Sequence, residues 1–464
     1  MPPTRLSRAS GHGRAGAPVR LVHLGLGNFF RAHQAWYTEH CPGAGEWGYA
    51  AFSGVGPGIA GALTAQGGLY TLVTRAADGD HFEVLSTVSR AHPAEDHDAW
   101  LGYFRSPLLA AVTVTVTEAG YLRRADGSLD VGRAEVEADI EALRRDRSAP
   151  VRTAPGRIVA GLAARRDADA GPIALVPCDN VPGNGAMARR SVLDLAGLVD
   201  PRLADWVGDS LGIVTTAVDR ITPRATDDDV LAVLRGTAVH DAVPVVTEPF
   251  REWVLEGAFP AGRPQWEQAG ATFTEDVTPY ERRKLWLLNG AHSILAYAGS
   301  ILGHQTVAAA IADDTCQDWV RQWWSEACPH LDQPAGELAT YRDSLLERFS
   351  NPRMQDRLAR IAHDGSQKLP IRILPVLRAE RAAGRLPAGA TRALAAWVCH
   401  LRGQGAPVHD ARAADVVPLA GGPLASAVPK LLAALDPAVG ADPDVVAIVT
   451  GQSEQLARLA PGAE

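Results

Sequence analysis

The sequence predicts an α/β protein, with a doubly wound, mostly parallel sheet over residues 18–278 and a second, mostly α-helical domain over residues 279–464. Length is the first observation, because 464 residues exceed what one hydrophobic core usually supports. The second is the alternation of short apolar strands with helical segments in the first part of the chain. The third is the near disappearance of strand signals after about residue 278, where patterns such as "DTCQDWVRQWWSEACPHL" dominate.

Six apolar segments have the composition of buried strands. They are "VRLVHL" at 19–24, "YAAFSG" at 49–54, "LYTLVTR" at 69–75, "AVTVTVT" at 111–117, "IALVPC" at 173–178 and "LGIVTTAV" at 211–218. Helical segments such as "GRAEVEADIEALRRD" and "AMARRSVLDLAGLV" separate several of them. Strands that alternate with helices in this way predict a mostly parallel sheet with helices on both faces.

The ends and the composition of the chain limit the class of protein. The first residues, "MPPTRLSRASGHGRAGAP", lack the apolar stretch of a signal peptide, so we expect residues 1–17 to be a disordered tail. A net charge of -8 does not favour binding to nucleic acid or to an anionic membrane, because both are negatively charged. Five cysteines without a CxxC pair or metal-ligand spacing suit a reducing cytoplasm. We predict a cytoplasmic protein that binds no metal, nucleic acid or membrane.

A glycine turn follows the first strand. "HLGLGNFF" places Gly25-x-Gly27-x-x-Phe30 between that strand and a helical pattern. The first glycine permits a tight turn, and the second lets the backbone approach a pyrophosphate at a helix N-terminus. Phe30 stands where the usual pattern has a third glycine, so a plain strand-to-helix turn is the alternative. The position of the glycine motif directly after the first strand favours a Rossmann-like dinucleotide site. Its cofactor contacts are then expected from Gly25, Gly27, Asn28 and Phe30.

The second strand carries a weaker cofactor signal. An acidic residue at its end usually holds the ribose hydroxyls. The chain reads "FSGVGPG" there, with neither an acid nor an arginine. We predict NAD as the cofactor, and the residues leave NADP open.

A helix with polar residues among leucines is predicted at "DVTPYERRKLWLLNGAHSILAYAG". Thr278, with Pro279 and Glu281 after it, fits a capping box at the helix start. At about 100° per residue, His292 lies about 80° and Asn289 about 140° from Lys284, with Glu281 inside that arc. Apolar residues cover the other positions, so the helix is expected to be buried.

These polar residues have two interpretations. In the structural one, the lysine pairs with a distant carboxylate and the histidine is satisfied in the core. In the catalytic one, desolvation lowers the pKa of Lys284 so that its amine accepts a proton. Asn289 then donates a hydrogen bond to an oxygen on which charge develops. Glu281 is either a helix cap or part of a proton relay.

Three further polar residues follow predicted strands. Asn180, in "VPCDNVPGNG", is expected at the carboxyl end of the sheet, where ligands of α/β proteins bind, although these residue types also favour a plain turn. Glu118, in "TVTEAGY", and Asp219, in "AVDRITP", also follow strand ends. Each is either a ligand contact or a cap.

Together these segments resemble the mannitol dehydrogenase family, the metal-independent polyol-specific long-chain dehydrogenases and reductases. The resemblance extends from about residue 19 to 375 and also includes "EPFREWVLEG", "AGRPQWE" and "FSNPRMQDRLARIAHDGSQKLP". It implies a Rossmann domain followed by a mostly helical domain, and hydride transfer to a nicotinamide cofactor. Trp286 and Ala291 depart from the family's core motif, where smaller or more polar residues are expected.

The resemblance also implies roles for individual residues. Lys284 is the general base in alcohol oxidation and the acid in ketone reduction. Asn180 and Asn289 polarise the reacting oxygen, and His292 positions it. The remaining assignments are Glu281 as the glutamate that passes protons between the lysine and solvent, Arg360 and Lys368 as substrate contacts, and Glu118 and Asp219 as residues near the nicotinamide.

The sequence determines the substrate less closely than it determines the fold or the catalytic residues. The resemblance favours a sugar polyol and its ketose, of the mannitol and fructose type. The alternatives are a fructuronate reductase (D-mannonate oxidoreductase) and a mannitol-1-phosphate 5-dehydrogenase. A uronate requires a cation against its carboxylate, and the candidates are Arg31, Arg220, Arg224 and Arg372. A non-catalytic NAD-binding sensor is disfavoured because the catalytic set is complete. We expect a small-molecule substrate and either a monomer or a homodimer.

Overall fold

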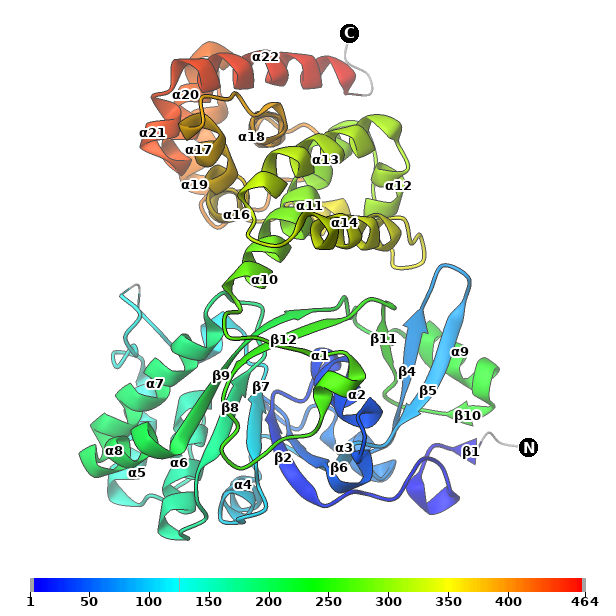
Figure 1. Cartoon of the computed structure of the whole chain (residues 1–464), viewed down its shortest axis with the longest axis vertical. Coiled ribbons are helices and arrows are strands. Elements are labelled where there is room, and N and C mark those ends of the chain that lie inside the picture. The colour runs from blue at the N-terminus through cyan, green and yellow to red at the C-terminus, as the bar shows by residue number, and fades with distance from the viewer. Residues whose placement is uncertain (1–3, 125, 461–464) are drawn as a thin grey trace. The chain divides into compact units, whose positions relative to one another are not determined.

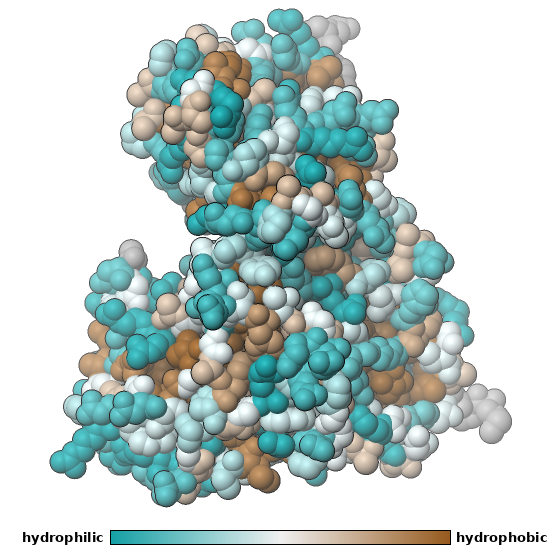
Figure 2. Space-filling model, in the orientation of Figure 1, coloured by the Kyte–Doolittle hydropathy of each residue, from teal (hydrophilic) through white to brown (hydrophobic). Residues whose placement is uncertain are grey.

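The structure is a computed structural model that describes residues 4–124 and 126–460. The chain divides into two compact units, residues 1–278 and 279–464. Figure 2 shows hydrophilic residues spread over the drawn face of both units, with hydrophobic residues in small patches between them, as is usual for globular surfaces. Within the described residues, no helix combines the length and the hydropathy needed to cross a membrane.

The first unit is built on an eight-stranded sheet with the order β13-β12-β9-β8-β7-β2-β3-β6 (Figure 1). The pairs from β9 to β6 are parallel, whereas β12 runs antiparallel to β9. The strands are β2 (Val19–Leu24), β3 (Gly48–Phe52), β6 (Val88–His92), β7 (Ala111–Val114), β8 (Ile173–Pro177), β9 (Leu211–Asp219), β12 (Glu252–Gly257) and β13 (Thr272–Phe273). The parallel part has the strand order of a Rossmann fold, which confirms the predicted fold class.

Helices cover both faces of this sheet. Helices α4 (His97–Phe104), α5 (Ala134–Arg145), α6 (Ala154–Asp167), α7 (Asn184–Val199) and α8 (Pro201–Ser210) form one layer (Figure 1). On β2, Val22 packs into the core beneath this layer, whereas Leu21 packs into the core on the opposite face. The opposite face carries α1 (Asn28–Ala32), α2 (Gln34–His40) and α3 (Ala60–Ala65). Because both faces are covered, most side chains of the central strands are buried, including the polar His23 and Thr113.

One predicted strand lies outside the main sheet. The segment 69–75 forms β4 (Tyr70–Arg75), which pairs with β5 (Asp80–Leu85) and β11 (Val245–Thr247) in a separate three-stranded sheet. The edge position of the main sheet is taken by β6 instead. Sequence reasoning missed β6 because it is short and partly polar, with Val88 and Ser89 buried and Arg90 exposed.

The predicted disordered tail is wrong for the described residues 4–17. β1 (Thr4–Arg5) pairs with β10 (Val239–His240), and Leu6 is 1% exposed. The Arg8 guanidinium donates to the carbonyl oxygens of Gly67, Arg14, Ser86 and Val88. A basic segment is therefore ordered because its arginines satisfy carbonyl groups that the strands leave unpaired.

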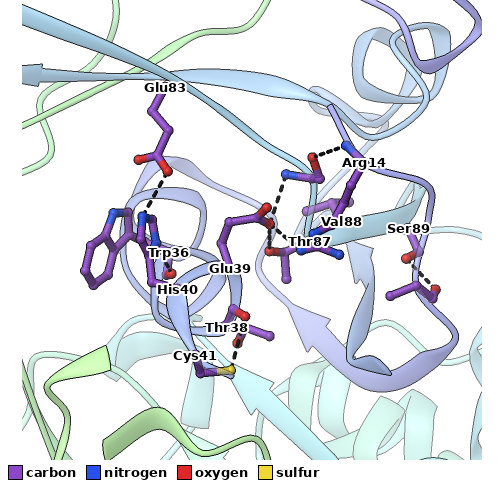
Figure 3. A network of polar contacts seen from close by, with 12 residues as sticks. Arg14, Trp36, Thr38, Glu39, His40, Cys41, Glu83, Thr87, Val88 and Ser89 are labelled. Atoms are coloured by element: carbon purple, nitrogen blue, oxygen red, sulfur yellow. Dashed lines mark hydrogen bonds and ion pairs between the residues drawn. The ribbon is translucent and has the colours of Figure 1, made fainter. Parts of the chain in front are cut away.

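Glu39 on α2 completes this attachment (Figure 3). Its carboxylate accepts hydrogen bonds from the Arg14 guanidinium at 2.7 Å, from the Ser86 backbone N–H at 3.0 Å and from the Thr87 hydroxyl. One carboxylate thus joins the N-terminal segment, α2 and the approach to β6.

The second unit is helical, and none of the named strands lies within its described residues. Its core is centred on α18, whose side chains are buried almost all round and include the fully buried Trp397. The helices are α10 (Thr278–Arg283), which begins at the unit boundary, η5 (Lys284–Gly290), α11 (Ala291–Ile294), η6 (Leu295–Gly299), α12 (Val307–Ile311), α13 (Asp314–Ala327), α14 (Ala335–Phe349), α15 (Leu358–Ile361), α16 (Gly365–Arg372), α17 (Leu374–Ala382), α18 (Ala388–Leu401), α19 (Ala413–Val416), α20 (Leu424–Leu435), α21 (Pro437–Gly440) and α22 (Pro443–Leu459), together with two short 3-10 turns.

We expect Glu39→Ala to lower the free energy of unfolding by about 2 to 4 kcal/mol, because it leaves a buried N–H and a hydroxyl without their acceptor. Urea denaturation measures this change. Trypsin should also cleave after Arg8 and Arg14 faster in the variant than in the wild type. Glu46→Ala, at an exposed position, is the control and should behave like the wild type. Equal trypsin cleavage in Glu39→Ala would contradict the proposed attachment.

Candidate active site

The glycine turn joins β2 to α1. Gly25 has φ +111°, and a Cβ atom there would overlap the Thr115 carbonyl oxygen, so only glycine fits. The backbone N–H groups of Gly25 and Leu26 donate to the Phe52 carbonyl at 2.9 and 2.8 Å. Gly27 caps α1 with extended backbone, and its added Cβ would lie 3.5 Å from the nearest atom, an ordinary contact. The fold itself requires the first glycine, whereas the second leaves room beside the turn.

The Asn28 and Phe30 side chains support the fold around this turn. The Asn28 amide donates to the Pro223 carbonyl at 3.2 Å and accepts from Arg31 at 2.8 Å. Phe30 is fully buried and stacks on the His23 ring at 3.7 Å between centroids. Burial lowers the pKa of His23 to about 3, so this ring is neutral. A cofactor contact from Phe30 could therefore use only its backbone.

Asn180, Glu118 and Asp219 lie at the carboxyl ends of neighbouring strands. Glu118 opens the 3-10 turn Glu118–Tyr121 after β7, exposed Asn180 follows β8, and Asp219 ends β9 at 5% exposure. This edge is where α/β proteins bind ligands.

Asp179 braces the loops at this edge. It accepts from the Thr117 N–H at 2.7 Å and from the Tyr121 hydroxyl at 2.6 Å. Burial raises the pKa of this carboxyl group. The loops after β7 and β8 are thus joined by a residue that sequence reasoning did not single out.

A cavity of about 360 Å³ opens at the same edge, beside the ends of β3 and β7. Its mostly apolar lining includes Gly54, Val55 and the segment 115–117. Glu135 and Arg152 add one carboxylate and one guanidinium to the lining. Sequence reasoning missed both, because they come from α5 and the turn before α6, far from the glycine motif along the chain.

The polar helix begins at Thr278, as predicted, but it does not stay α-helical. After α10 it continues as the π-helix η5 (Lys284–Gly290), returns to α11, and becomes π-helical again in η6. Residues five apart lie about 140° apart in an α-helix. The i→i+5 bonding of a π-helix instead places them on successive turns. Lys284 and Asn289 are five residues apart, so the π register brings them toward one face.

Burial along this helix differs between the candidate residues and the apolar residues around them. Trp286, Leu287, Leu288 and Gly290 are buried. Glu281, Lys284, Asn289 and His292 are half-buried. The His292 ring packs against Phe349 of α14 at 4.8 Å between centroids. The predicted buried helix is thus present, with the four candidate side chains on less buried positions.

Helix α16 brings two cations to this segment. Arg372 donates to the Asn289 carbonyl at 3.4 Å and to the Ser293 hydroxyl at 3.2 Å, and burial lowers its pKa to about 10. The Lys368 ammonium donates to the Ile361 carbonyl at 3.3 Å. Burial, followed by the charge of Arg372, lowers the pKa of Lys368. Arg360, the other predicted substrate contact, is 70% exposed and paired with Asp356.

The other three arginines that were considered as partners of a uronate carboxylate have different surroundings. Arg31 and Arg220 are 2% and 6% exposed and donate to backbone carbonyls of the first unit. Arg224 is exposed in a loop. Arg372 belongs to the second unit and contacts the polar helix.

Composition holds a signal that sequence reasoning missed. Of 45 lysine and arginine residues, three are lysines: Lys284, Lys368 and Lys430. An arginine side chain stays protonated in proteins, whereas a lysine can lose its proton. In a chain that uses arginine almost everywhere, two of the lysines lie on the polar helix and on the helix packed beside it.

Among the described residues, His304, Asp313 and Cys316 form the one group of three potential metal ligands, within 4.8 Å of one another. Asp313 caps α13 and pairs with His304 at 3.0 Å. Burial raises the pKa of the Cys316 thiol to about 12. These contacts account for the group without a metal ion.

The chain matches known proteins along most of its length. Residues 19–268 match the mannitol dehydrogenase Rossmann domain, and residues 276–448 match the mannitol dehydrogenase C-terminal domain. A mannitol 2-dehydrogenase of Cereibacter sphaeroides is 38% identical, over 81% of this chain and 80% of that protein. A D-mannonate oxidoreductase of Escherichia coli is also 38% identical, over 77% and 75%. The Pseudomonas fluorescens mannitol 2-dehydrogenase, solved as a ternary complex with NAD and D-mannitol, is 31% identical with a TM-score of 0.78, covering 98% of this chain and 94% of that one.

Gly25 and Gly27 offer a matched test of the turn. We expect Gly25→Ala to lower the free energy of unfolding by about 3 kcal/mol or more, because φ +111° and the Thr115 carbonyl exclude a side chain. Gly27→Ala should change it by less than about 1 kcal/mol. Urea denaturation of both variants measures the difference, and equal stabilities would contradict this account of the turn.

Proposed function

The chain belongs to the mannitol dehydrogenase family, as its motifs predicted, and we propose that it transfers a hydride between a nicotinamide cofactor and a secondary alcohol of a sugar polyol, of the mannitol and fructose type. One observation carries the proposal: Lys284, Asn289 and His292 lie half-buried on one helical segment in which π register brings the first two toward one face. NAD is the proposed cofactor, supported by the NAD complex of the Pseudomonas fluorescens relative.

The residues divide the chemistry between them. Bound nicotinamide supplies the acceptor for the hydride that leaves the alcohol carbon. Lys284 takes the hydroxyl proton as the ketone forms, and its ammonium returns a proton to the oxygen in the reverse direction. Asn289 and Asn180 donate hydrogen bonds to the oxygen on which charge develops, and His292 orients it. Glu281, three residues before Lys284, passes protons between the amine and solvent.

The first unit offers suitable groups for the cofactor. The tight Gly25 turn and the extended Gly27 leave space for a pyrophosphate beside the start of α1. The cavity beside β3 and β7 has apolar walls that suit an adenosine group. Its lining combines Glu135 with Arg152, and no acid follows β3 to repel a 2′-phosphate, so NADP is the alternative cofactor.

A second candidate substrate is a sugar acid, fructuronate or mannonate. The observation in its favour is the half-buried pair Lys368 and Arg372, whose second member contacts Asn289. Two cations beside the proposed oxygen-binding residues suit a carboxylate. The similarity to the Escherichia coli D-mannonate oxidoreductase supports the same substrate class.

We expect the purified protein to oxidise NADH or NADPH with fructose, and more slowly with fructuronate. Lys284→Ala should lower kcat by about a thousandfold, because it removes the proton donor. Lys430→Ala, at an exposed lysine, is the control and should leave kcat unchanged. Faster turnover of fructuronate would select the sugar-acid candidate. Full activity in Lys284→Ala would reject the catalytic assignment.

The sugar-acid candidate makes its own prediction. Arg372→Met should lower kcat/KM for fructuronate about tenfold or more beyond its effect on fructose, because only the acid loses a charge-assisted hydrogen bond. Arg378→Met serves as the comparison, since Arg378 is exposed and paired with Asp436. Equal losses on both substrates in Arg372→Met would assign this arginine a purely structural role.

A further inference from the structure

Two buried indoles contact the backbone of η5. Trp323 and Trp324 are consecutive residues of α13 and are 0% and 2% exposed. The Trp323 Nε1–H donates to the Trp286 carbonyl at 2.8 Å. The Trp324 Nε1–H donates to the Leu287 carbonyl at 2.9 Å. Two consecutive carbonyl groups of the π-helix therefore accept from side chains of another helix.

These two hydrogen bonds affect whether η5 keeps π or α hydrogen bonding. Where a helix changes between α and π bonding, carbonyl groups lose their usual partner four residues on. A buried carbonyl without a partner costs free energy, so such a register persists where another donor reaches it. The two indoles supply donors to carbonyls that lie between Lys284 and Asn289 in the chain.

The surroundings hold the indoles in place. A Cβ atom at Gly290 would lie 2.6 Å from the Trp323 Nε1 atom, so glycine there lets the indole approach the helix. Three residues after Trp323 on α13, Glu326 accepts from the N–H groups of Gly389 and Ala390 at 2.7 and 2.9 Å, which fixes α13 to the start of α18.

The other end of η5 is held as well. The Asn289 carbonyl accepts from the Ser293 hydroxyl at 3.1 Å and from Arg372 at 3.4 Å. Donors from α11, α13 and α16 thus satisfy three carbonyls of this seven-residue segment.

We propose that Trp323 and Trp324 are positioning residues that hold η5 in π register and so keep Lys284 and Asn289 on successive turns of one helix face. The consequence for catalysis rests on the proposed function. The geometry itself does not depend on which substrate is used.

Phenylalanine variants test the proposal, because they remove the N–H donor and keep most of the aromatic volume. Trp323→Phe and Trp324→Phe should each lower kcat about tenfold to a hundredfold, through misplacement of the reacting groups. The pH dependence of kcat should also shift, while KM changes less than about threefold. Trp397→Phe is the matched control. Trp397 is 0% exposed in the same unit, and its Nε1 has no hydrogen-bond partner among the described residues.

A second measurement follows Lys284 without turnover. With three lysines in the chain, protein labelled with [ε-¹³C]lysine gives three side-chain signals, which single Lys→Arg variants assign. The titration midpoint of the Lys284 signal should move by more than about half a pH unit in both phenylalanine variants. It should stay in place in Trp397→Phe.

The outcomes separate the possibilities. Wild-type kinetics and Lys284 titration in both phenylalanine variants overturn the proposal. Equal losses of activity in all three variants, with an unchanged Lys284 titration, also overturn the proposal. That result would show that the indoles contribute only to the packing of the core. If the wild type reduces none of the ketoses tested, the proposed function fails, and the titration still decides the positioning role. If the phenylalanine variants do not fold, Gly290→Ala, which displaces the Trp323 indole, is titrated instead, and an unchanged midpoint there overturns the proposal.

Discussion

A buried helix with ionisable side chains is stable only if its polar groups find partners, and this constraint organises the second unit. The segment from Thr278 to Gly299 passes twice from α to π bonding. Side chains of α13 and α16 donate hydrogen bonds to carbonyl groups of this segment, and Phe349 of α14 packs on His292. The helices around the segment therefore do more than fill volume, because each of these contacts also fixes where a polar side chain lies.

Buried arginines perform the equivalent task in the first unit. Arg31, Arg157, Arg165 and Arg220 are between 0% and 6% exposed, and all donate to backbone carbonyls. The single guanidinium of Arg165 donates to the carbonyl groups of Phe104, Ser106, Ala170, Gly171 and Pro172, at the end of α4 and in the loops beside it and before β8. The rigid fork of a guanidinium suits such clusters of acceptors, and its high pKa keeps it charged even where burial lowers the pKa of Arg165 to about 10.

The sequence predicted what depends on local pattern and residue type. Continuous apolar strands between helical segments predicted the doubly wound sheet, and the Thr278–Pro279 start predicted the polar helix. What it missed depends on contacts between distant segments. The π register of η5 needs donors from Trp323 and Trp324, which lie 37 residues beyond their acceptors. The ordered segment 4–17 needs Glu39 and the carbonyls near β6, and the contact of Arg372 with Asn289 spans 83 residues. Hydropathy periods and turn signals carry no information about such pairs.

The contrast between arginine and lysine connects structure to chemistry. Because 45 cationic residues include three lysines, arginine makes most of the structural contacts of cations in this chain, although Lys368 also donates to a backbone carbonyl. Unlike an arginine, a lysine can give up its proton in a protein. Lys284 is half-buried on a segment whose backbone is held by neighbouring helices, which is poor placement for a solvated charge and suitable placement for an amine that exchanges a proton. An arginine at this position would keep the charge and the packing and lose the acid–base step. The half-buried position of Lys284 therefore suits the proton-transfer role proposed for this helix.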